Sequence, residues 1–350
     1  MNLFHPDDHE RLVADASLFD ADQLEATYGP WGRQLLRNAL ALEVLAHLTP
    51  RVPGLLLKGG TLLQSRLQWP PRRASVDLDL ETGDADGLRS ALVDALEPFS
   101  ATRPRLEFED AMVPGFLAYL RFGDEPPTVL RVDALAFPHP PSGASPWRLP
   151  EPWKDATPPL AAPLETQAAQ KLLLAAPLPY GRDIQQHLGR QNLVKDLYDL
   201  RCLADQDLDA RRIIAAAAED IDRKSAYLGQ AFDLEAVAAG AQETLLMLAQ
   251  APVKDASTRG ALWRARPKVQ SGIRTGFPAD EFRIAAGCAH HSLHGILEGE
   301  LDWQDAWRPA TKRVPRAAWQ DAKEIPTIVQ ADDDFGTGRG VREAWARPAP

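Results

Sequence analysis

The chain contains little cysteine, no long apolar run and no excess of positive charge. Its two cysteines, Cys202 and Cys288, form no CxxC pair, which argues against a disulfide framework or a thiolate zinc site. No segment approaches the roughly 18 consecutive apolar residues of a membrane helix, and residues 1–10 lack the apolar run of a signal peptide. The formal net charge of −10 repels nucleic acid, so any RNA contact must come from a local basic patch. We therefore expect a cytoplasmic protein that does not enter a membrane.

The first half of the chain has the pattern of an α/β fold. With 350 residues and 45% hydrophobic content, the chain can build one large domain or two ordinary ones. Apolar spacing predicts helices at 31–49 and 84–97. Short or alternating apolar runs predict strands at 55–58, 75–81, 104–109, 115–122 and 128–137. Gly59 and Gly60 are predicted to form a turn, and Thr61 to cap a short helix that ends near residue 67.

A proline-rich segment separates this half from a helical one. Nine prolines occur between Pro138 and Pro163, a density that no helix or central strand tolerates, so a linker or wrapped loop is expected. Beyond it, apolar spacing predicts helices at 164–176, 191–205, 208–222, 231–250 and 280–299. The end of the chain, where Trp303, Trp307 and Trp319 occur among many charges, is expected to be irregular.

Two carboxylates follow the predicted glycine turn. In the alternating run SVDLDLE at 75–81, Asp77 and Asp79 lie on one face of a strand, and the apolar residues lie on the other. Glycine lets the backbone approach a ligand, and a helix N-terminus favours an anion such as a triphosphate. Two carboxylates on one pleat can share a magnesium ion, which keeps substrate phosphates among its ligands. Asp133, in the apolar run VLRVDALAF, is the expected third ligand, because a lone buried charge is costly.

Each of these features also has an ordinary structural explanation. Asp-x-Asp is common on solvated strand faces, and a pair of glycines is a frequent turn. Either feature alone points to a structural role. Combined with Asp133, they favour phosphoryl transfer, in which a metal ion neutralises charge on the transferring group.

A set of motifs in a fixed order resembles the AbiEii/AbiGii toxin family, whose members include the MenT toxins. The motifs, within residues 31–250, are the KGGT turn at 58–61, the run Arg73-x-Ser75-x-Asp77-x-Asp79, Asp133, Lys171 in LETQAAQKLLLAA, and KDLYDL at 195–200. The resemblance implies an α+β fold, with a DNA-polymerase-β-like nucleotidyltransferase core and a mixed sheet, followed by a mostly helical domain. It also implies a toxin of a type IV toxin-antitoxin or phage-defence system. In the MenT branch, pyrimidine nucleotides are transferred to the 3′ acceptor end of transfer RNA.

The resemblance assigns roles to individual residues. Asp77, Asp79 and Asp133 would bind Mg²⁺ (or Mn²⁺), and the catalytic set would also include Lys171 and Asp196. The nucleotide would be bound by Lys58, Gly59, Gly60, Thr61, Arg73, Ser75 and Lys171. Judged on the residues alone, Lys171 would extend to the surface from an apolar helix; the resemblance makes it a point charge for the triphosphate.

Several of these roles have open alternatives. Lys58 either contacts phosphate or caps a sheet edge. Asp196 and Asp199 share a helix face. They either orient Lys171 or a metal-bound water, or form a structural salt bridge with Lys195 or Arg190.

Two segments outside these motifs have chemical potential of their own. Residues 259–274 contain five basic residues, no acidic one and a tryptophan, a composition typical of an RNA-binding patch or of a solvated linker. His290 and His294 have the spacing of one helix face, with His291 beside them. A zinc site would need a third ligand or a catalytic acid, and neither is evident, so ordinary core or surface histidines are expected.

The expected organisation has four parts. These are a nucleotidyltransferase core with an N-terminal helix at 1–137, a linker at 138–163, a helical domain completing the active site at 164–250, and an extension of unknown role at 251–350. The expected reaction transfers a nucleoside monophosphate from a nucleoside triphosphate to RNA, with the tRNA 3′ end as acceptor and a cognate antitoxin as partner. Two alternatives stay open: modification of a small molecule or protein hydroxyl, and nucleotide binding without turnover.

Overall fold

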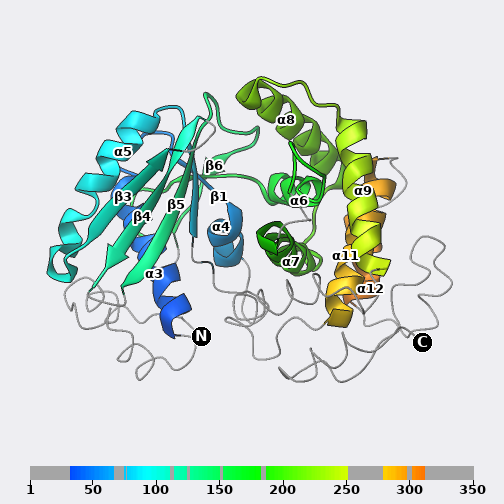
Figure 1. The fold of residues 1–350 in the computed structure, drawn as a ribbon, viewed down its shortest axis with the longest axis horizontal. Helices are drawn as coiled ribbons and strands as arrows, with labels where there is room; N and C mark the ends of the chain where they lie inside the picture. The colour runs from blue at the N-terminus through cyan, green and yellow to red at the C-terminus, as the bar shows by residue number, and fades with distance from the viewer. Residues whose placement is uncertain are drawn as a thin grey trace. The chain divides into compact units, whose positions relative to one another are not determined.

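The computed structural model divides the chain into two compact units, Met1–Pro163 and Leu164–Pro350 (Figure 1). It describes residues 32–66, 75, 77–110, 114–123, 127–149, 153–182, 187–250, 279–297 and 302–311. The first unit contains the sheet, and the second is built from helices. No helix within these ranges is both long and apolar enough to cross a bilayer.

In the described part of the first unit, seven strands form one mixed sheet in the order β3-β4-β5-β2-β1-β7-β6. The strands are β1 (Leu56–Lys58), β2 (Asp77–Thr82), β3 (Arg105–Asp110), β4 (Gly115–Phe122), β5 (Thr128–Ala136), β6 (Ser145–Pro146) and β7 (Leu160–Ala161). β2 runs parallel to β5 and antiparallel to β1. It therefore lies at the centre of the sheet with a partner on each side.

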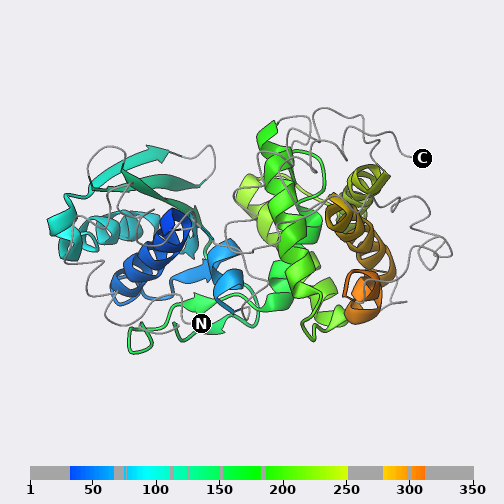
Figure 2. The same ribbon diagram turned by 90° about the horizontal axis from the view of Figure 1, so that it is seen from below.

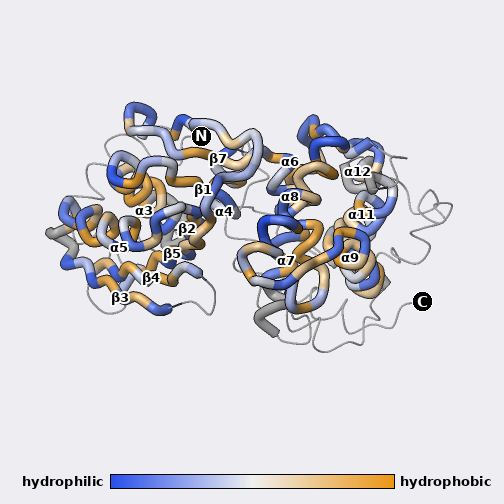
Figure 3. Tube along the Cα trace, turned by 90° about the horizontal axis from the view of Figure 1, so that it is seen from above, coloured by the Kyte–Doolittle hydropathy of each residue, from blue (hydrophilic) through white to orange (hydrophobic). Residues whose placement is uncertain are grey.

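Helices cover one face of this sheet and bury its apolar side chains. The helical elements of this unit are α3 (Gly32–Leu48), α4 (Gly59–Arg66), α5 (Ala85–Asp94) and the 3-10 helix η3 (Glu97–Thr102). α3 and α5 lie side by side and pack against β5 (Figure 2). Leu78, Leu80 and Val132 belong to the resulting core and are fully buried. Figure 3 shows the apolar stretches in α3 and the neighbouring strands.

The glycine pair begins a helix rather than forming a separate turn. α4 starts at Gly59, where φ is +69°, and Thr61 lies inside the helix. The prediction that Thr61 is the N-cap is therefore wrong. Its hydroxyl instead donates to the carbonyl oxygen of Asp77 at 2.5 Å, which ties α4 to the start of β2.

Part of the proline-rich segment belongs to the sheet. β7 pairs in parallel with β1, and β6 pairs with β7 at the edge of the sheet. Pro146 lies in this edge strand, where its missing N–H can face away from the ladder. The segment between Pro138 and Pro163 thus wraps along one side of the sheet instead of only connecting the two units.

The second unit is a helical bundle that includes α11 and α12, two helices beyond residue 250. Its helices are α6 (Leu164–Leu173), α7 (His187–Leu203), α8 (Ala210–Leu228), α9 (Leu234–Gln250), α11 (Ala279–Leu297) and α12 (Trp303–Thr311). α6 packs on α7 and α8, α11 packs on α9 and α7, and α12 packs on α11. α11 and α12, the helices that the structure describes after residue 250, therefore belong to the core of this unit.

Two tryptophans anchor α12 in that core. Trp303 and Trp307 are fully buried, and their ring centroids lie 5.4 Å apart. The Trp303 indole N–H donates to the carbonyl oxygen of Leu203 at 3.0 Å. The prediction of an irregular chain end is therefore wrong for residues 303–311, whereas residues 312–350 lie outside the described ranges.

Candidate active site

Three aspartates share the sheet face opposite the buried leucines. Asp77 and Asp79 alternate with Leu78 and Leu80 along β2, and both aspartates are partly exposed. The parallel register places Asp79 directly beside Asp133 of β5. The structure thus brings the three predicted metal ligands together on two adjacent strands. Like charges this close are destabilising unless a cation compensates them.

Gly59 makes room for one of these carboxylates. A β-carbon built at Gly59 would lie 1.9 Å from Oδ2 of Asp79, and the φ of +69° also favours glycine. Gly60 follows inside α4 and is buried. The first glycine of the KGGT motif therefore lets the backbone at the start of α4 pass directly over the Asp79 side chain.

A buried ion pair lies next to the aspartates. Lys58 is opposite Asp79 across the β1–β2 ladder, and its ammonium donates to Glu81 Oε1 at 2.5 Å. Only 3% of the Glu81 side chain is exposed. Sequence reasoning assigned no role to Glu81, although its position two residues after Asp79 already placed it on the same face. In the structure, Lys58 forms an ion pair with Glu81. The contact of Lys58 with phosphate remains a prediction.

Asp133 is paired with an arginine on its own strand. Arg131 Nε lies 2.7 Å from Oδ1 of Asp133, and Nη2 lies 2.8 Å from Oδ2. Burial raises the pKa of Asp133 to about 6; the charges of Asp79 and Asp77 add to the rise, and Arg131 opposes it. Arg131 was also missed from the sequence, although its spacing of two residues from Asp133 was the available signal.

The remaining predicted nucleotide-binding residues of the first unit are placed only in part. Ser75 is 4% exposed and lies just before β2. The Thr61 hydroxyl donates a hydrogen bond to the Asp77 carbonyl oxygen, as described above. Arg73 lies outside the described residues. The contacts of these side chains with a nucleotide therefore stay predictions.

In the second unit, Lys171 and Asp196 belong to a buried charge network. The Lys171 ammonium lies 3.1 Å from Oδ1 of Asp196 and 2.7 Å from Oδ2 of Asp199. Arg182 binds the other oxygen of Asp196 at 2.8 Å. Burial alone would raise the pKa of Asp196, but the charges of Arg182, Lys171 and Lys195 outweigh it and lower the pKa to about 2. Of the alternatives left open for Asp196 and Asp199, the structure shows their contact with Lys171.

Another buried carboxylate, Asp220, was missed from the sequence and binds the residue that precedes Lys171 in α6. Asp220 of α8 accepts a hydrogen bond from Gln170 at 2.8 Å and lies 3.1 Å from the Lys224 ammonium. The Tyr180 hydroxyl also donates to Asp220. Burial and the Asp220 charge raise the pKa of Tyr180 well above its ordinary value. Gln170 and Lys171 are thus each fixed by acids from a different helix.

One histidine of the cluster contacts the neighbouring helix α9. In α11, Nδ1 of His290 lies 3.2 Å from the carbonyl oxygen of Gln242. Among the described residues, no three His, Cys, Asp or Glu side chains are arranged to hold a metal ion by themselves. The basic segment 259–274 lies outside the described residues, so its role as an RNA patch stays a prediction.

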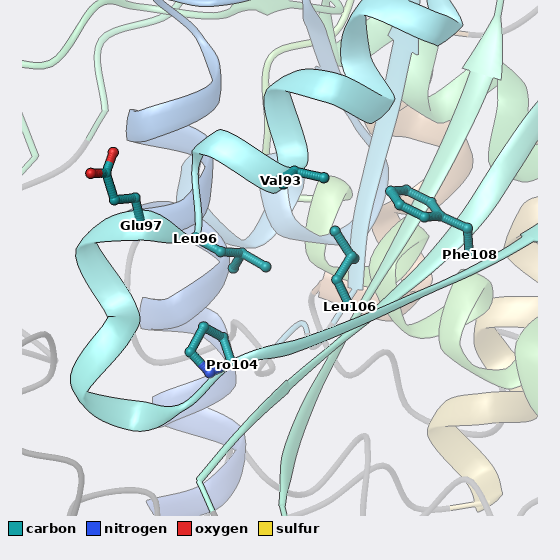
Figure 4. Close-up of a pocket in the computed structure, with 6 residues that line it drawn as sticks. All are labelled: Val93, Leu96, Glu97, Pro104, Leu106 and Phe108. Carbon is teal, nitrogen blue, oxygen red and sulfur yellow. The ribbon is translucent and has the colours of Figure 1, made fainter.

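An apolar hollow of about 520 Å³ lies elsewhere in the first unit (Figure 4). It is lined by Val93, Leu96, Glu97, Pro104, Leu106 and Phe108. Leu106 pairs with buried Leu120 of β4, and Phe108 pairs with buried Ala118. These strand positions belong to the face of the sheet covered by α5, so the hollow lies on the opposite face from Asp77 and Asp79.

A mixed sheet with an acidic pair after a glycine-led helix, followed by a helical bundle, agrees with the nucleotidyltransferase class. In fold, the chain is similar to MenT4, a nucleotidyltransferase toxin from Mycobacterium tuberculosis H37Rv, with 15% identity and a TM-score of 0.50 over 87% of this chain and 96% of that one. A protein-family model described as "Nucleotidyl transferase AbiEii toxin, Type IV TA system" matches residues 43–271. The chain therefore belongs to the AbiEii nucleotidyltransferase toxin family of type IV toxin-antitoxin systems.

Other comparisons gave weaker likenesses. A structure from H. pylori, described as a candidate nucleotidyltransferase, has 15% identity and a TM-score of 0.43 over 76% of this chain and 96% of that one. JHP933 from Helicobacter pylori has 17% identity and a TM-score of 0.30 over 59% of this chain and 87% of that one. No curated protein matches the chain. The family and the nucleotidyltransferase fold predicted from the motifs are confirmed by the family model and the MenT4 likeness.

Proposed function

We propose that the protein transfers a nucleoside monophosphate to the 3′ end of an RNA, with tRNA as the acceptor, using Mg²⁺ (or Mn²⁺) bound by Asp77, Asp79 and Asp133. The observation that carries this proposal is the direct pairing of Asp79 with Asp133 on the face that also carries Asp77. Three carboxylates that repel one another gain most from a shared divalent cation. A type IV toxin also acts with a cognate antitoxin, which is the expected protein partner.

The donor set of this face fits a magnesium ion. All three side chains offer carboxylate oxygens, which are the ligands that Mg²⁺ prefers. Among the described residues, no group of three such side chains is arranged to hold a metal ion by itself, but Mg²⁺ in such enzymes is usually bound by one or two carboxylates together with substrate phosphates and water. When bound, the metal would neutralise charge on the transferring phosphoryl group and on the departing pyrophosphate.

The reaction exchanges a phosphoanhydride bond of the nucleotide for a phosphodiester bond to the acceptor. The acceptor hydroxyl oxygen forms a bond to the α-phosphorus, the bond from the α-phosphorus to the bridging oxygen breaks, and pyrophosphate leaves as the hydroxyl proton is released. The N-terminus of α4, beginning at Gly59, offers backbone N–H groups of the kind that suit phosphate oxygens. The protein's own task is therefore positioning and charge compensation.

Lys171 is proposed to supply a positive charge to the triphosphate. Its ammonium is fixed by Asp196 and Asp199, and its side chain is 8% exposed. A lysine held by two acids has a defined position, which suits a point charge for phosphate. Asp196 is shared with Arg182, whereas Asp199 makes the shorter of the two contacts with Lys171. This assignment is independent of which base the nucleotide carries.

The RNA acceptor is supported by the resemblance to the MenT branch and by the composition of residues 259–274. Basic residues beside an aromatic side chain suit a single-stranded RNA end, where phosphate contacts and base stacking act together. The net charge of −10 means that such a local patch would have to overcome the repulsion of the rest of the molecule.

The test is a transfer assay with the purified full chain, total RNA and Mg²⁺, run with each of the four α-labelled nucleoside triphosphates. We expect label in RNA of tRNA size, and its removal by treatment that trims 3′ ends. Asp79→Asn serves as the inactive control, and Asp94→Asn, on the exposed end of α5, as the matched neutral control. Label that enters only small molecules or protein would overturn the RNA acceptor while leaving nucleotidyl transfer in place.

A further inference from the structure

Arg131 contacts both carboxylate oxygens of Asp133, one of the three proposed metal ligands. Its Nε and Nη2 atoms lie 2.7 and 2.8 Å from Oδ1 and Oδ2 of Asp133. This is the two-pronged geometry in which guanidinium and carboxylate match best. A cation that binds Asp133 must share or replace at least one of these contacts.

The exposure of Arg131 leaves its guanidinium room to move from Asp133 towards the phosphates of a bound nucleotide. Its side chain is 43% exposed, whereas that of Asp133 is 26% exposed, so packing does not enclose the guanidinium. Its strand position is directly beside Asp77. A short turn of the side chain would therefore keep the positive charge next to the three aspartates, where the phosphates of a metal-bound nucleotide would also lie.

We propose that Arg131 is a positioning residue that competes with the metal ion for Asp133 and turns to the triphosphate when the metal binds. The inference rests on the proposed function. Without nucleotide, the metal must displace a charge-assisted pair, which weakens its binding. With nucleotide, the freed N–H donors meet phosphate oxygens, which match a guanidinium as well as a carboxylate does.

A coupling between the two ligands follows. If Arg131 opposes the metal alone and assists the nucleotide, each ligand strengthens the binding of the other, and by the same factor. A purely structural arginine would have a different effect: its removal would weaken both ligands or neither. The sign of the change in metal affinity is therefore the decisive quantity.

The experiment measures Mn²⁺ binding to Arg131→Gln by isothermal titration calorimetry at pH 8, first without nucleotide. We expect Mn²⁺ to bind about three- to tenfold more tightly than to the wild type, the range for losing a partly exposed charge-assisted pair. In saturating Mn²⁺, the four α,β-methylene nucleoside triphosphates are then titrated in turn. The nucleotide analogue that the wild type binds best should bind Arg131→Gln about three- to tenfold more weakly than it binds the wild type.

The sheet offers a matched control for this substitution. Arg121 makes the same kind of two-pronged contact, with Nε and Nη2 lying 3.1 and 3.0 Å from the two oxygens of Glu107. It lies on the same sheet face but at the β3–β4 end. Arg121→Gln should leave both affinities unchanged. Arg131→Lys keeps the positive charge but loses the two-pronged contact, so its affinities for Mn²⁺ and nucleotide should lie between those of the wild type and Arg131→Gln. This variant decides the question if Arg131→Gln does not fold.

Two failures can be told apart. Unchanged or weaker Mn²⁺ binding by folded Arg131→Gln, or unchanged nucleotide binding, overturns the role of Arg131. Asp79→Asn tests the metal site itself: if this variant binds Mn²⁺ as well as the wild type, the metal site of the proposed function is overturned. Circular dichroism and thermal melting of each variant confirm that the comparison is made between folded proteins.

Discussion

Asp79 and Asp133 lie directly beside each other on the parallel strands β2 and β5. A pair of neighbouring carboxylates costs stability in a sheet, and Asp77 adds a third charge on the same face. Arg131 compensates only part of this charge, because the pKa of Asp133 is still raised to about 6, by burial first and then by Asp79. The arrangement is unfavourable for stability and suited to binding a cation.

Asp79→Asn is therefore expected to abolish transfer without unfolding the protein. Loss of a metal ligand should lower the rate of nucleotide incorporation by about a hundredfold or more, whereas removing one like charge should leave the melting temperature unchanged or slightly higher. Incorporation of labelled nucleotide and thermal melting measure the two effects. Full incorporation by Asp79→Asn would mean that catalysis does not use this site.

Gly59→Ala should displace the Asp79 carboxylate, because the added methyl group would collide with it. The added β-carbon would lie 1.9 Å from Oδ2 of Asp79, at a residue with φ of +69°. We expect a loss of about 2–4 kcal/mol in the free energy of unfolding, from overpacking and backbone strain together, and a large loss of transfer activity. Urea denaturation and the transfer assay provide the measurements.

Gly54→Ala is the matched control for that substitution. Gly54 has a φ of +75°, but nothing lies within 4 Å of a β-carbon built there. Only the backbone strain remains, at about 1 kcal/mol, and activity should be retained. Equal losses at both positions would show that contact with Asp79 is unimportant.

Asp199→Asn should destabilise the helical unit strongly. Asp199 is fully buried and lies 2.7 Å from the Lys171 ammonium. Removing its charge takes one carboxylate contact away from the buried Lys171 ammonium, at a cost of about 3–5 kcal/mol. Asp205→Asn, which removes an exposed partner of Arg201, should change the stability by less than about 1 kcal/mol. Urea denaturation followed by circular dichroism at 222 nm compares the two variants.

Acid should destabilise the helical unit through Asp196. Its pKa is lowered to about 2 from an ordinary value of 3.8, because Arg182, Lys171 and Lys195 outweigh the effect of burial. A carboxyl with a lowered pKa in the folded state contributes stability above the unfolded value and loses it as the pH falls through the folded one. This contribution, on the order of 2 kcal/mol, should therefore be present at pH 5 and lost progressively between about pH 4 and pH 2.

Urea denaturation at pH 5 and at pH 3 measures this loss. Asp196→Asn should be less stable than the wild type at pH 5, and its stability should depend less on pH over the same interval. A wild type and an Asp196→Asn variant with parallel pH profiles would contradict the assignment. Because other acids also titrate in this range, the difference between the two profiles is the quantity to compare.

Trp303→Ala should show that α12 belongs to the folded core. Trp303 is fully buried and donates to the carbonyl oxygen of Leu203. Its truncation should cost about 3–5 kcal/mol in the free energy of unfolding. Gln304→Ala, at the exposed neighbouring position, should change stability by less than about 0.5 kcal/mol. Near-wild-type stability of Trp303→Ala would place α12 outside the cooperative unit.

The carboxylate face could be predicted in part because a strand has a period of two. Alternation alone places Asp77 and Asp79 together, and the same rule would have joined Arg131 to Asp133. It does not say which strands become neighbours. The pairing of Asp79 with Asp133 depends on the parallel contact of β2 and β5, which is set by long-range packing that local patterns do not contain.

The local errors have physical reasons of their own. Thr61 was expected to cap a helix because hydroxyls favour that position, but the left-handed Gly59 lets α4 begin two residues earlier. The proline-rich segment supplies sheet strands because Pro146 lies in the edge strand, where a proline is tolerated. Trp303 and Trp307 stabilise a short helix that charged surroundings had suggested was irregular.

The late position of α12 in the chain affects the order of folding during synthesis. The sheet of the first unit is completed by β7, which ends at Ala161, so it can form while the ribosome is still translating the second half. The helical unit requires Trp303 and Trp307 in its core, and these residues are made long after Lys171 and Asp199. The core around α7, whose Leu203 carbonyl accepts a hydrogen bond from Trp303, therefore acquires its final packing only after α12 has been made.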